Sequence, residues 1–368
     1  MVKYKKTLKC YFVGDIALGD HPKSVGFGFY SKYKQGIPLE KAETLFPTGI
    51  KADVIFGNLE FNIGEVSLSG TDFSHINCRG IRQYGEFLKA AGFNILNIAN
   101  NHIFQYGRAE FDKTVKLLSS NNILIAGLKD DKDAKNKIQI DDQSIVFLAW
   151  SARPRQGFNC EPPYKEFKED ECYREIENAK SIADIICVSL HWGEEFIEIP
   201  SGDERRIARS MIDKGATIVL GHHPHVVREV EEYNGGLIAY SLGNFICDMT
   251  WNKLTAKTGL LSVDFEDGRI RGWEWIPGKI AEDFFPRYCN SPDSVTGDSY
   301  FAKSRRLKDK MSSTSYGELA KKALSHHRRL TLFHMLKNIH RYDRSILSEI
   351  ICNALKSRFI KFIARSDN

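Results

Sequence analysis

The sequence predicts an α/β fold with a largely buried sheet. First, short apolar runs of strand length, rich in β-branched residues, recur through the first 280 residues. Second, amphipathic stretches of helix length separate these runs, and such alternation is typical of α/β proteins. Third, the runs are almost continuously apolar, which indicates strands that are covered on both faces.

The predicted elements follow this pattern in order. Strands are expected at residues 10–13, 53–56, 93–99, 145–150, 185–190 and 217–220. Helices are expected between them, at residues 81–91, 108–119, 172–182 and 203–214. Gly92, Gly107 and Gly215 mark helix boundaries, where glycine is favoured. Between residues 237 and 280 the pattern changes to strands with a tight turn at Glu266-Asp267-Gly268, which favours antiparallel pairing.

Composition excludes several classes of protein. Hydrophobic residues make up 42% and charged residues 27% of the chain, as in ordinary globular proteins and unlike disordered or fibrous ones. No apolar run approaches the roughly 18 residues of a membrane-spanning helix, and no secretory signal is recognised at the N-terminus. The eight cysteines stand singly, so a disulfide framework or a zinc finger is not expected. The chain is therefore predicted to be cytoplasmic.

The positive charge is concentrated at the C-terminus. Residues 301–368 hold 16 Lys and Arg against 5 Asp and Glu, a net charge of +11, whereas the remaining residues have a net charge of −6. We predict a main domain at residues 1–285, a linker at 286–317 and a basic helical tail at 318–368. Apolar residues recur at helical spacing along the tail, at Leu347, Ile351, Leu355, Phe359 and Ile363.

The apolar stripe and positive charge of the tail predict a binding role, for which two kinds of target are considered. Docking on the main domain or on a protein partner is the first, and peripheral binding to an anionic membrane surface is the second. Nucleic acid is not an expected partner, because no nucleic-acid motif is present and the main domain is acidic. If the tail serves only recruitment, a chain that ends near Lys303 should fold and keep its chemistry.

Polar side chains gather where the predicted strands end. They are Asp15, Asn58, Glu60, Asn101, His102, His191, Trp192, Glu195, His222, His223, His225 and Asn244. Ligands of α/β sheets bind outside the carboxyl ends of the strands, and imidazole and carboxylate groups suit Zn²⁺, Mn²⁺ and Fe. Two such metals can activate water and clamp a phosphoryl group. No Walker-type loop and no Gly-x-Ser-x-Gly motif offers a different chemistry.

The spacing of the last histidines carries a local prediction. In an extended segment, side chains alternate between two faces, so His223 and His225 should lie on one side and His222 on the other. His222 is therefore expected to support the site rather than to bind metal.

These motifs resemble those of the capsule-synthesis CapA family, within the calcineurin-like metallophosphoesterase superfamily. The resemblance covers about residues 8–250. It rests on Gly14-Asp15-x-x-Leu18, Asn58-Leu59-Glu60, Asn101-His102, His191-Trp192-Gly193-x-Glu195, Gly221-His222-His223-Pro224-His225 and Tyr240-Ser241-Leu242-Gly243-Asn244-Phe245. It implies a four-layer α/β/β/α sandwich with a binuclear metal site between the sheet edges. It also implies a role in making or exporting a capsule polymer, either poly-γ-glutamate or a polysaccharide.

The resemblance also implies a role for each matching residue. Asp15 is the expected first-strand metal ligand, Glu60 the bridging carboxylate and Asn101 an amide ligand. His191, His223 and His225 complete the ligands of one or two divalent ions, which would be Mn, Fe, Zn or Mg. His102 is the expected catalytic residue, contacting the scissile group as a general acid or a charge stabiliser.

Five further residues are expected to contact substrate or to orient a ligand: Asn58, Trp192, Glu195, His222 and Asn244. For Trp192 and Glu195, lining the substrate cleft is one interpretation; an equally good one is that Trp192 packs against the loop and Glu195 orients a ligand histidine. Asn244 is expected to hold the histidine loop in place.

Two positions depart from the wider pattern. The superfamily has Asp-x-His where this chain has Ala17, an absence shared by CapA relatives, so the number of metals stays open. The family usually reads Asn-His-x-x-Asp-x-Gly, and here Gln105 replaces the aspartate. A neutral amide gives a weaker hydrogen bond to a protonated imidazole than a carboxylate does, which should lower the pKa of His102.

The predicted function is metal-dependent hydrolysis of a phosphoester or related bond in capsule or surface-polymer biosynthesis. The substrate would be the polymer or a phosphorylated compound. The alternative is a non-catalytic factor for capsule assembly or export, which retains the metal site and meets a polymer synthase through the tail. Ala17 and Gln105 favour the alternative, whereas His191, His223 and His225 favour the enzyme.

Overall fold

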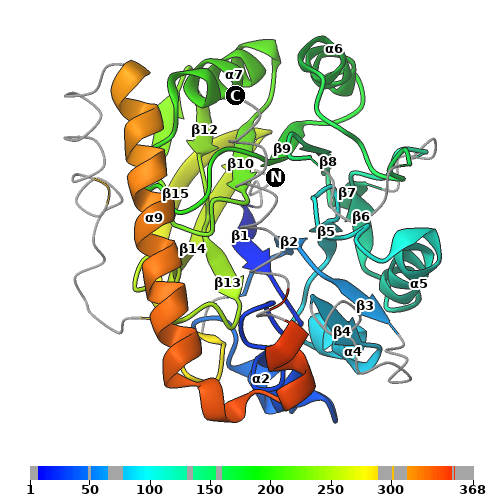
Figure 1. The fold of residues 1–368 in the computed structure, drawn as a ribbon. Helices are drawn as coiled ribbons and strands as arrows, with labels where there is room; N and C mark the ends of the chain where they lie inside the picture. Colours follow the sequence, from blue (N-terminus) through cyan, green and yellow to red (C-terminus); the bar gives the residue numbers. More distant parts are fainter. Residues whose placement is uncertain are drawn as a thin grey trace.

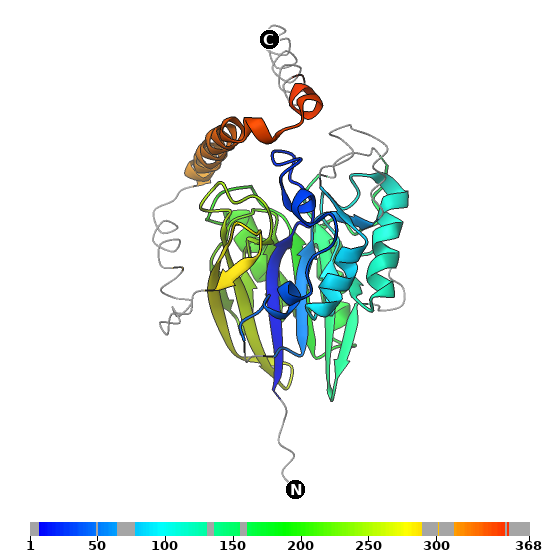
Figure 2. The same cartoon turned by 90° about the horizontal axis from the view of Figure 1, so that it is seen from below.

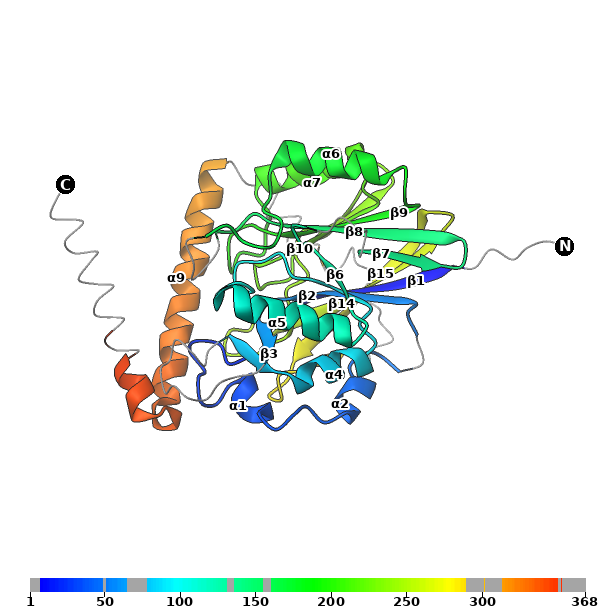
Figure 3. The same cartoon turned by 90° about the vertical axis from the view of Figure 1, so that its right-hand side faces the viewer.

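Two β-sheets lie face to face between two layers of helices (Figure 1). The computed structural model describes residues 7–48, 51–64, 78–130, 136–154, 160–288, 301, 313–349 and 352. Viewed from the side in Figure 3, helices α6 and α7 cover one sheet, and helices α2, α4 and α5 cover the other. The predicted α/β class and the four-layer α/β/β/α order are confirmed.

The first sheet has the strand order β16-β15-β14-β1-β2-β5-β6, with β13 paired to β1. Strands β1, β2, β5 and β6 are parallel, and β14, β15 and β16 continue the sheet in antiparallel fashion. Their bounds are β1 Leu8–Ile16, β2 Val54–Leu59, β5 Ile95–Asn97, β6 Leu124–Ala126, β13 Asn244–Ile246, β14 Lys257–Glu266, β15 Arg269–Ile280 and β16 Pro286–Tyr288.

The second sheet has the order β11-β12-β10-β9-β8-β7. Its four inner strands are parallel, and antiparallel strands close both edges. The bounds are β7 Lys137–Ile140, β8 Gln143–Ser151, β9 Ile185–His191, β10 Ile218–His222, β11 Val230–Tyr233 and β12 Gly236–Ala239. A separate pair consists of β3 Asn62–Gly64 and β4 Arg79–Ile81.

The helices present an apolar face to the sheets and a charged face outward. On the first sheet lie α1 Phe29–Tyr33, α2 Glu40–Glu43, α4 Gln83–Ala90 and α5 Gly107–Ser120; on the second lie α6 Glu169–Ala179 and α7 Gly202–Lys214. Helix α7 begins with a capping box, in which Ser201 and Glu204 exchange side-chain and backbone hydrogen bonds. It ends at Gly215, whose φ of 120° suits only glycine.

One long helix lies across the carboxyl ends of the strands. Helix α9, Ser313–Lys337, crosses the edge of both sheets opposite the N-terminus, and the short helix η1, Ile339–Arg341, follows it (Figures 2 and 3). Tyr316 donates a hydrogen bond to Glu204 of α7, and near the other end Met335 packs beside Val25. The helix therefore spans from the second sheet's helices to the loop after β1.

The described part of the tail packs against the main domain. Strand β16 extends the main sheet three residues into the segment predicted as a linker, and α9 packs on the domain. Of the predicted apolar stripe, Leu347 packs beside Tyr342 and Ile346, while Ile351, Leu355, Phe359 and Ile363 lie outside the described residues. None of the helices in the described ranges is long and apolar enough to cross a membrane.

Candidate metal centre

The predicted site residues meet at the edge where the parallel strands of both sheets end. In the first sheet, Asp15 lies opposite Asn58 of β2 and opposite Asn244 of β13. In the second sheet, His191 lies opposite His222. Since the two sheets face each other, these strand ends bring carboxylate and amide groups toward imidazoles.

A close backbone approach fixes Asn244 beside Asp15. The amide of Asp15 donates a hydrogen bond to the carbonyl oxygen of Gly243, at 2.9 Å. A Cβ atom at Gly14 would lie only 1.9 Å from that oxygen, so any other residue would push the two segments apart.

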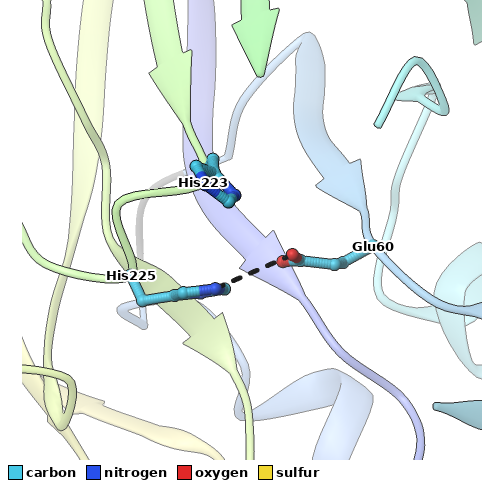
Figure 4. Close-up of side chains that lie close together, drawn as sticks. All are labelled: Glu60, His223 and His225. Atoms are coloured by element: carbon cyan, nitrogen blue, oxygen red, sulfur yellow. Dashed lines mark ion pairs between the residues drawn. The ribbon is translucent and has the colours of Figure 1, made fainter. Parts of the chain in front are cut away.

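Glu60, His223 and His225 form a compact group of three metal-binding side chains (Figure 4). One ligand atom from each lies within 4.8 Å of the other two, and all three residues are buried. Nε2 of His225 is 3.9 Å from Oε1 of Glu60. Such a set of one carboxylate and two imidazoles is typical of divalent-metal sites.

The group has polar atoms that the protein does not satisfy. Both carboxylate oxygens of Glu60 and both ring nitrogens of His223 are buried without a hydrogen-bond partner in the described ranges. Leaving such atoms unpaired costs about 1–3 kcal/mol each. The residues present therefore fit a cation, because one ion would satisfy a carboxylate oxygen and an imidazole nitrogen together.

The segment from His223 to His225 is not extended. The prediction that strand alternation places both imidazoles on one side was therefore wrong. Strand β10 ends at His222, and the chain then turns: φ is 95° at His223 and 58° at His225. This left-handed backbone costs on the order of 1–3 kcal/mol per non-glycine residue, a cost typical of functional sites. The turn, rather than strand alternation, directs both imidazoles toward Glu60.

Asn244 orients His225. Its side-chain oxygen accepts a hydrogen bond from Nδ1 of His225 at 3.0 Å, while its amide donates to the carbonyl oxygen of Thr255 at 3.1 Å. With Nδ1 carrying the proton, Nε2 of His225 keeps a lone pair on the side of Glu60.

Asp15 lies beside the three-residue group and is already well partnered. Its Oδ1 accepts a hydrogen bond from Asn58 at 2.8 Å and lies 3.3 Å from Nδ1 of His222, and its Oδ2 accepts one from the amide of His223 at 3.2 Å. Burial acts to raise the pKa of Asp15, but the adjacent His222 imidazole, with further contributions from His225 and Asn58, outweighs burial and lowers it. His222 therefore faces Asp15.

Burial has the opposite net effect on Glu60. It raises the pKa of Glu60 well above its ordinary value, and the negative charges of Asp15 and Glu195 add to this effect. Burial likewise lowers the pKa values of His191 and His223 well below their ordinary range, so both imidazoles are neutral at pH 7. Neutral imidazoles are the form that binds metal.

Asn101 and His191 form a second polar contact next to Glu60. The side-chain oxygen of Asn101 accepts a hydrogen bond from Nε2 of His191 at 2.7 Å, and this nitrogen is 3.9 Å from Oε1 of Glu60. The rings of His191 and His223 lie 4.9 Å apart. In the Asn101–His191 contact, Asn101 follows β5 of the first sheet and His191 ends β9 of the second sheet.

His102 points its Nδ1 toward the residue that departs from the family pattern. Oε1 of Gln105 accepts a hydrogen bond from Nδ1 of His102 at 3.0 Å, and Phe61 packs against the ring edge to face. Burial lowers the pKa of His102 to about 4, and the hydrogen bond to Gln105 offsets only part of that effect. His102 is therefore neutral at physiological pH.

Replacing Gln105 by glutamate should raise the pKa of His102. Glutamate has the length of glutamine and places a negative charge about 3 Å from Nδ1, which favours the imidazolium. The histidine should then titrate above about 4 in an NMR pH titration, and the alkaline limb of a pH–rate profile should move upward if His102 is a general acid. Gln105→Met is the uncharged control, and equal pKa values in the glutamate and methionine variants would contradict the prediction.

The remaining predicted residues take different positions. Trp192 is 3% exposed, donates a hydrogen bond to the carbonyl oxygen of Tyr240 and belongs to the core beneath α7. Glu195 is 38% exposed, and its Oε1 lies 3.9 Å from Nε2 of His223. Ala17 occupies an apolar cluster with Phe61. Apolar packing thus surrounds the position at which the Asp-x-His pattern would have a histidine.

Sequence reasoning missed three residues that shape the site. Asn100 accepts hydrogen bonds from the amides of His102 and Ile103 and donates to the carbonyl oxygen of Leu59, so it ties the two loops together. Asn100 could have been predicted as a site residue, because it directly precedes Asn101 and His102 at the end of a predicted strand. Phe196 stacks on His225 at a centroid distance of 6.0 Å, and His327 of α9 stacks on Phe196 at 3.6 Å. No local pattern marks that long-range stack.

The fold and the site define an α/β protein with a histidine–carboxylate cluster at the shared edge of two sheets. The family described as "Bacterial capsule synthesis protein PGA_cap" matches residues 9–249. The chain belongs to this family, and the predicted resemblance is confirmed.

Two relatives from Bacillus species agree with this assignment. "PGA biosynthesis protein CapA" of Bacillus subtilis is 31% identical over 287 residues, which cover 75% of this chain and 72% of that protein. "Capsule biosynthesis protein CapA" of Bacillus anthracis is 28% identical over 339 residues, covering 86% and 77%. Among solved structures, a Staphylococcus aureus protein assigned as a 5′-nucleotidase has a TM-score of 0.49 at 14% identity, covering 83% of this chain and 58% of that one.

Proposed function

We propose that this chain is a metal-dependent hydrolase of capsule or poly-γ-glutamate biosynthesis that acts on a phosphoester or related bond. The observation that supports the proposal is the buried, converging group of Glu60, His223 and His225, in which the Glu60 carboxylate and the His223 ring have no hydrogen-bond partner among the described residues. Membership of the capsule synthesis family supplies the biological setting.

Glu60, His223 and His225 would hold a divalent ion. Asn101 and His191 lie next to Glu60 and would serve a second ion, with Asp15 as a further carboxylate ligand. The donor set of imidazole, carboxylate and amide suits Mn, Fe or Zn, and Mg to a lesser degree. A bound divalent ion supplies Lewis-acid activation of water and neutralises charge on a phosphoryl group.

The protein's own residues bind and orient the reactants in this scheme. Asn244 and Phe196 fix the ring of His225, and Asn100 fixes the loop that carries His102. His102 is neutral and its proton lies on Nδ1, facing Gln105, so its Nε2 would accept a hydrogen bond at the scissile group rather than carry a positive charge. Glu195, which is partly exposed near His223, would contact substrate.

A second candidate function has its own supporting observation. The neutral amide of Gln105 faces His102 where the family pattern has a carboxylate, and burial keeps His102 deprotonated. A chain with a weakened proton donor would bind metal and polymer as an assembly or export factor without hydrolysis.

Partners would meet the chain at two places. The polymer or a phosphorylated substrate would bind at the metal centre. A capsule synthase or an anionic membrane surface would bind the outer face of α9, where Leu332, Phe333 and Leu336 are 57%, 68% and 58% exposed beside Arg328 and Arg329.

Metal analysis followed by an activity screen tests the proposal. The purified chain, stripped with chelator and reloaded with Mn²⁺, Zn²⁺ or Fe²⁺, should retain one to two equivalents of metal by mass spectrometry. It should then hydrolyse a phosphodiester or phosphomonoester probe. Retained metal without hydrolysis of either probe would favour the assembly factor, and no retained metal would refute both.

A further inference from the structure

A cavity outside the metal centre lies between α9 and the loop that precedes α1. It has a volume of about 700 Å³, and its walls come from residues 24–32, the turn at 248–250, the segment at 282–284 and the end of α9. Figure 3 shows this end of α9 close to α1. None of Glu60, His223 and His225 lines it.

The walls carry more positive than negative charge. Lys32, Lys337 and Arg341 line the cavity, together with the carboxyl groups of Glu282 and Asp248. Lys32 donates to the carbonyl oxygen of Glu282 at 3.1 Å, and the guanidinium of Arg341 stacks over Phe27 at 4.5 Å. In the part of the chain that the structure describes, no carboxylate forms an ion pair with any of the three cations.

Three buried polar atoms of the lining residues have no partner. They are Oγ of Ser24, Oδ1 of Asp248 and Nε2 of His334, none of which has a hydrogen bond to a described residue. Asp248 is only 2% exposed, and its other oxygen accepts a hydrogen bond from the amide of His21 at 2.9 Å. Burial and the neighbouring charge of Asp20 raise the pKa of Asp248 to about 8, so at neutral pH its carboxyl group is protonated and can donate.

Two phenylalanine rings form part of the wall. Phe27 and Phe284 line the same cavity as the three cations. A bare oxyanion such as phosphate has no apolar part to cover these rings. A ligand with carboxylates on short methylene spacers has both parts, and its amide groups match the unpartnered atoms of Ser24 and Asp248.

We infer that this cavity is a second ligand site, which binds a segment carrying several carboxylates on short apolar spacers, the chemistry of a glutamate oligomer. Lys337, Arg341 and Lys32 meet the carboxylates, and Phe27 and Phe284 cover the methylene groups. The inference rests on the proposed role in poly-γ-glutamate biosynthesis for the choice of ligand, and on the cavity alone for the site. It makes α9 part of a binding surface for the polymer, separate from the metal centre.

Trp251 offers a probe for binding. Its ring stacks on His334 at a centroid distance of 4.3 Å, so its fluorescence should respond to a ligand in the cavity. The full chain, stripped of metal with a chelator that is then removed by gel filtration, would be titrated with γ-linked triglutamate, with its uncharged γ-linked glutamine analogue and with inorganic phosphate, and the affinity confirmed by calorimetry. We expect saturable binding of triglutamate alone.

Lys337→Ala is the decisive variant, because this side chain is exposed and its loss disturbs no ion pair of the described residues. It should weaken triglutamate binding about tenfold, as expected for one charge-assisted contact. Lys322→Ala, also exposed on α9 but outside the cavity lining, is the matched control and should bind as the parent chain does.

The outcomes separate this inference from the proposed function. His223→Ala/His225→Ala should still bind triglutamate, because the cavity does not use those residues. Absence of saturable binding, equal weakening in the Lys337 and Lys322 variants, or equal binding of phosphate would overturn the inference. The metal content of the chain is measured separately, so it tests the metal centre independently of triglutamate binding.

Discussion

Replacing His223 and His225 together by alanine should remove bound divalent metal and lower any metal-dependent hydrolysis by about 10³-fold or more. The double variant keeps only Glu60 of the three converging ligands. A metal supplies several kcal/mol of transition-state stabilisation, and about 4 kcal/mol corresponds to a factor of 10³ in rate. Metal content after reloading, measured by mass spectrometry, is the primary measurement.

The fold should survive this double replacement. Alanine meets the same backbone penalty at the left-handed positions as histidine does, since both have a Cβ atom. The His223 imidazole makes no side-chain hydrogen bond to the described residues, and His225 makes one, to Asn244. The circular dichroism spectrum should therefore match that of the parent chain. His340→Ala, at an exposed position far along the tail, is the matched control, and unchanged metal content in the double variant would refute the assignment.

Much of the fold could be predicted because the central strands are buried on both faces. The apolar runs at residues 10–13 and 185–190 lie within β1 and β9, and those at 53–56 and 217–220 begin one residue before β2 and β10. Each run is long enough for its continuous apolarity to be informative, and parallel strands end at a common edge. The convergence of Glu60 with His223 and His225 follows from that edge.

The short elements could not be predicted, because tertiary pairing rather than local sequence defines them. β5 occupies only Ile95–Asn97 of the apolar run at 93–99, and β13 is three residues long because only these residues reach β1. β16 begins at Pro286, where the composition suggested a linker. Such strands carry too few residues for a periodic signal.

The backbone geometry of the histidine segment could not be predicted from the sequence pattern either. A His-x-His spacing is compatible with a strand and with a left-handed turn, and the turn at His223 and His225 is held by contacts from distant segments. Asp15 receives the amide hydrogen bond of His223, and Asn244 receives that of the His225 ring. Both partners come from the other sheet, so only the folded arrangement selects the turn.

Ending the chain near Lys303 should destabilise the protein and weaken its metal site. The sequence allowed a detachable tail, but α9 packs on the loops around the site. Ala323 and Leu324 pack on the apolar cluster that contains Phe196, and Trp251 donates a hydrogen bond to Thr331 at 3.1 Å. Exposing such a surface should lower the free energy of unfolding by about 3 kcal/mol or more, at 1.5–3 kcal/mol for each large apolar side chain uncovered.

The effect on metal follows from the stack of His327, Phe196 and His225. Phe196 has a φ of 64°, and its ring lies between His225 and His327, which is 6% exposed. Without α9, Phe196 loses one face of its packing and no longer holds His225 firmly. Loss of a group that orients a metal ligand typically costs 10- to 100-fold in metal affinity, so the truncated chain should bind Mn²⁺ or Zn²⁺ at least about tenfold more weakly.

A matched variant separates the inner face of α9 from its outer face. Phe333 is 68% exposed, so Phe333→Ser should leave both the melting temperature and the metal affinity unchanged, while His327→Ala should lower the metal affinity through Phe196. Thermal unfolding and competitive metal titration measure the two quantities on the same samples. Truncated protein with the stability and metal affinity of the full chain would show that α9 is an appended recruitment helix. Loss of both, with Phe333→Ser unaffected, would make α9 a structural wall of the metal centre, because only its inner face contacts Phe196.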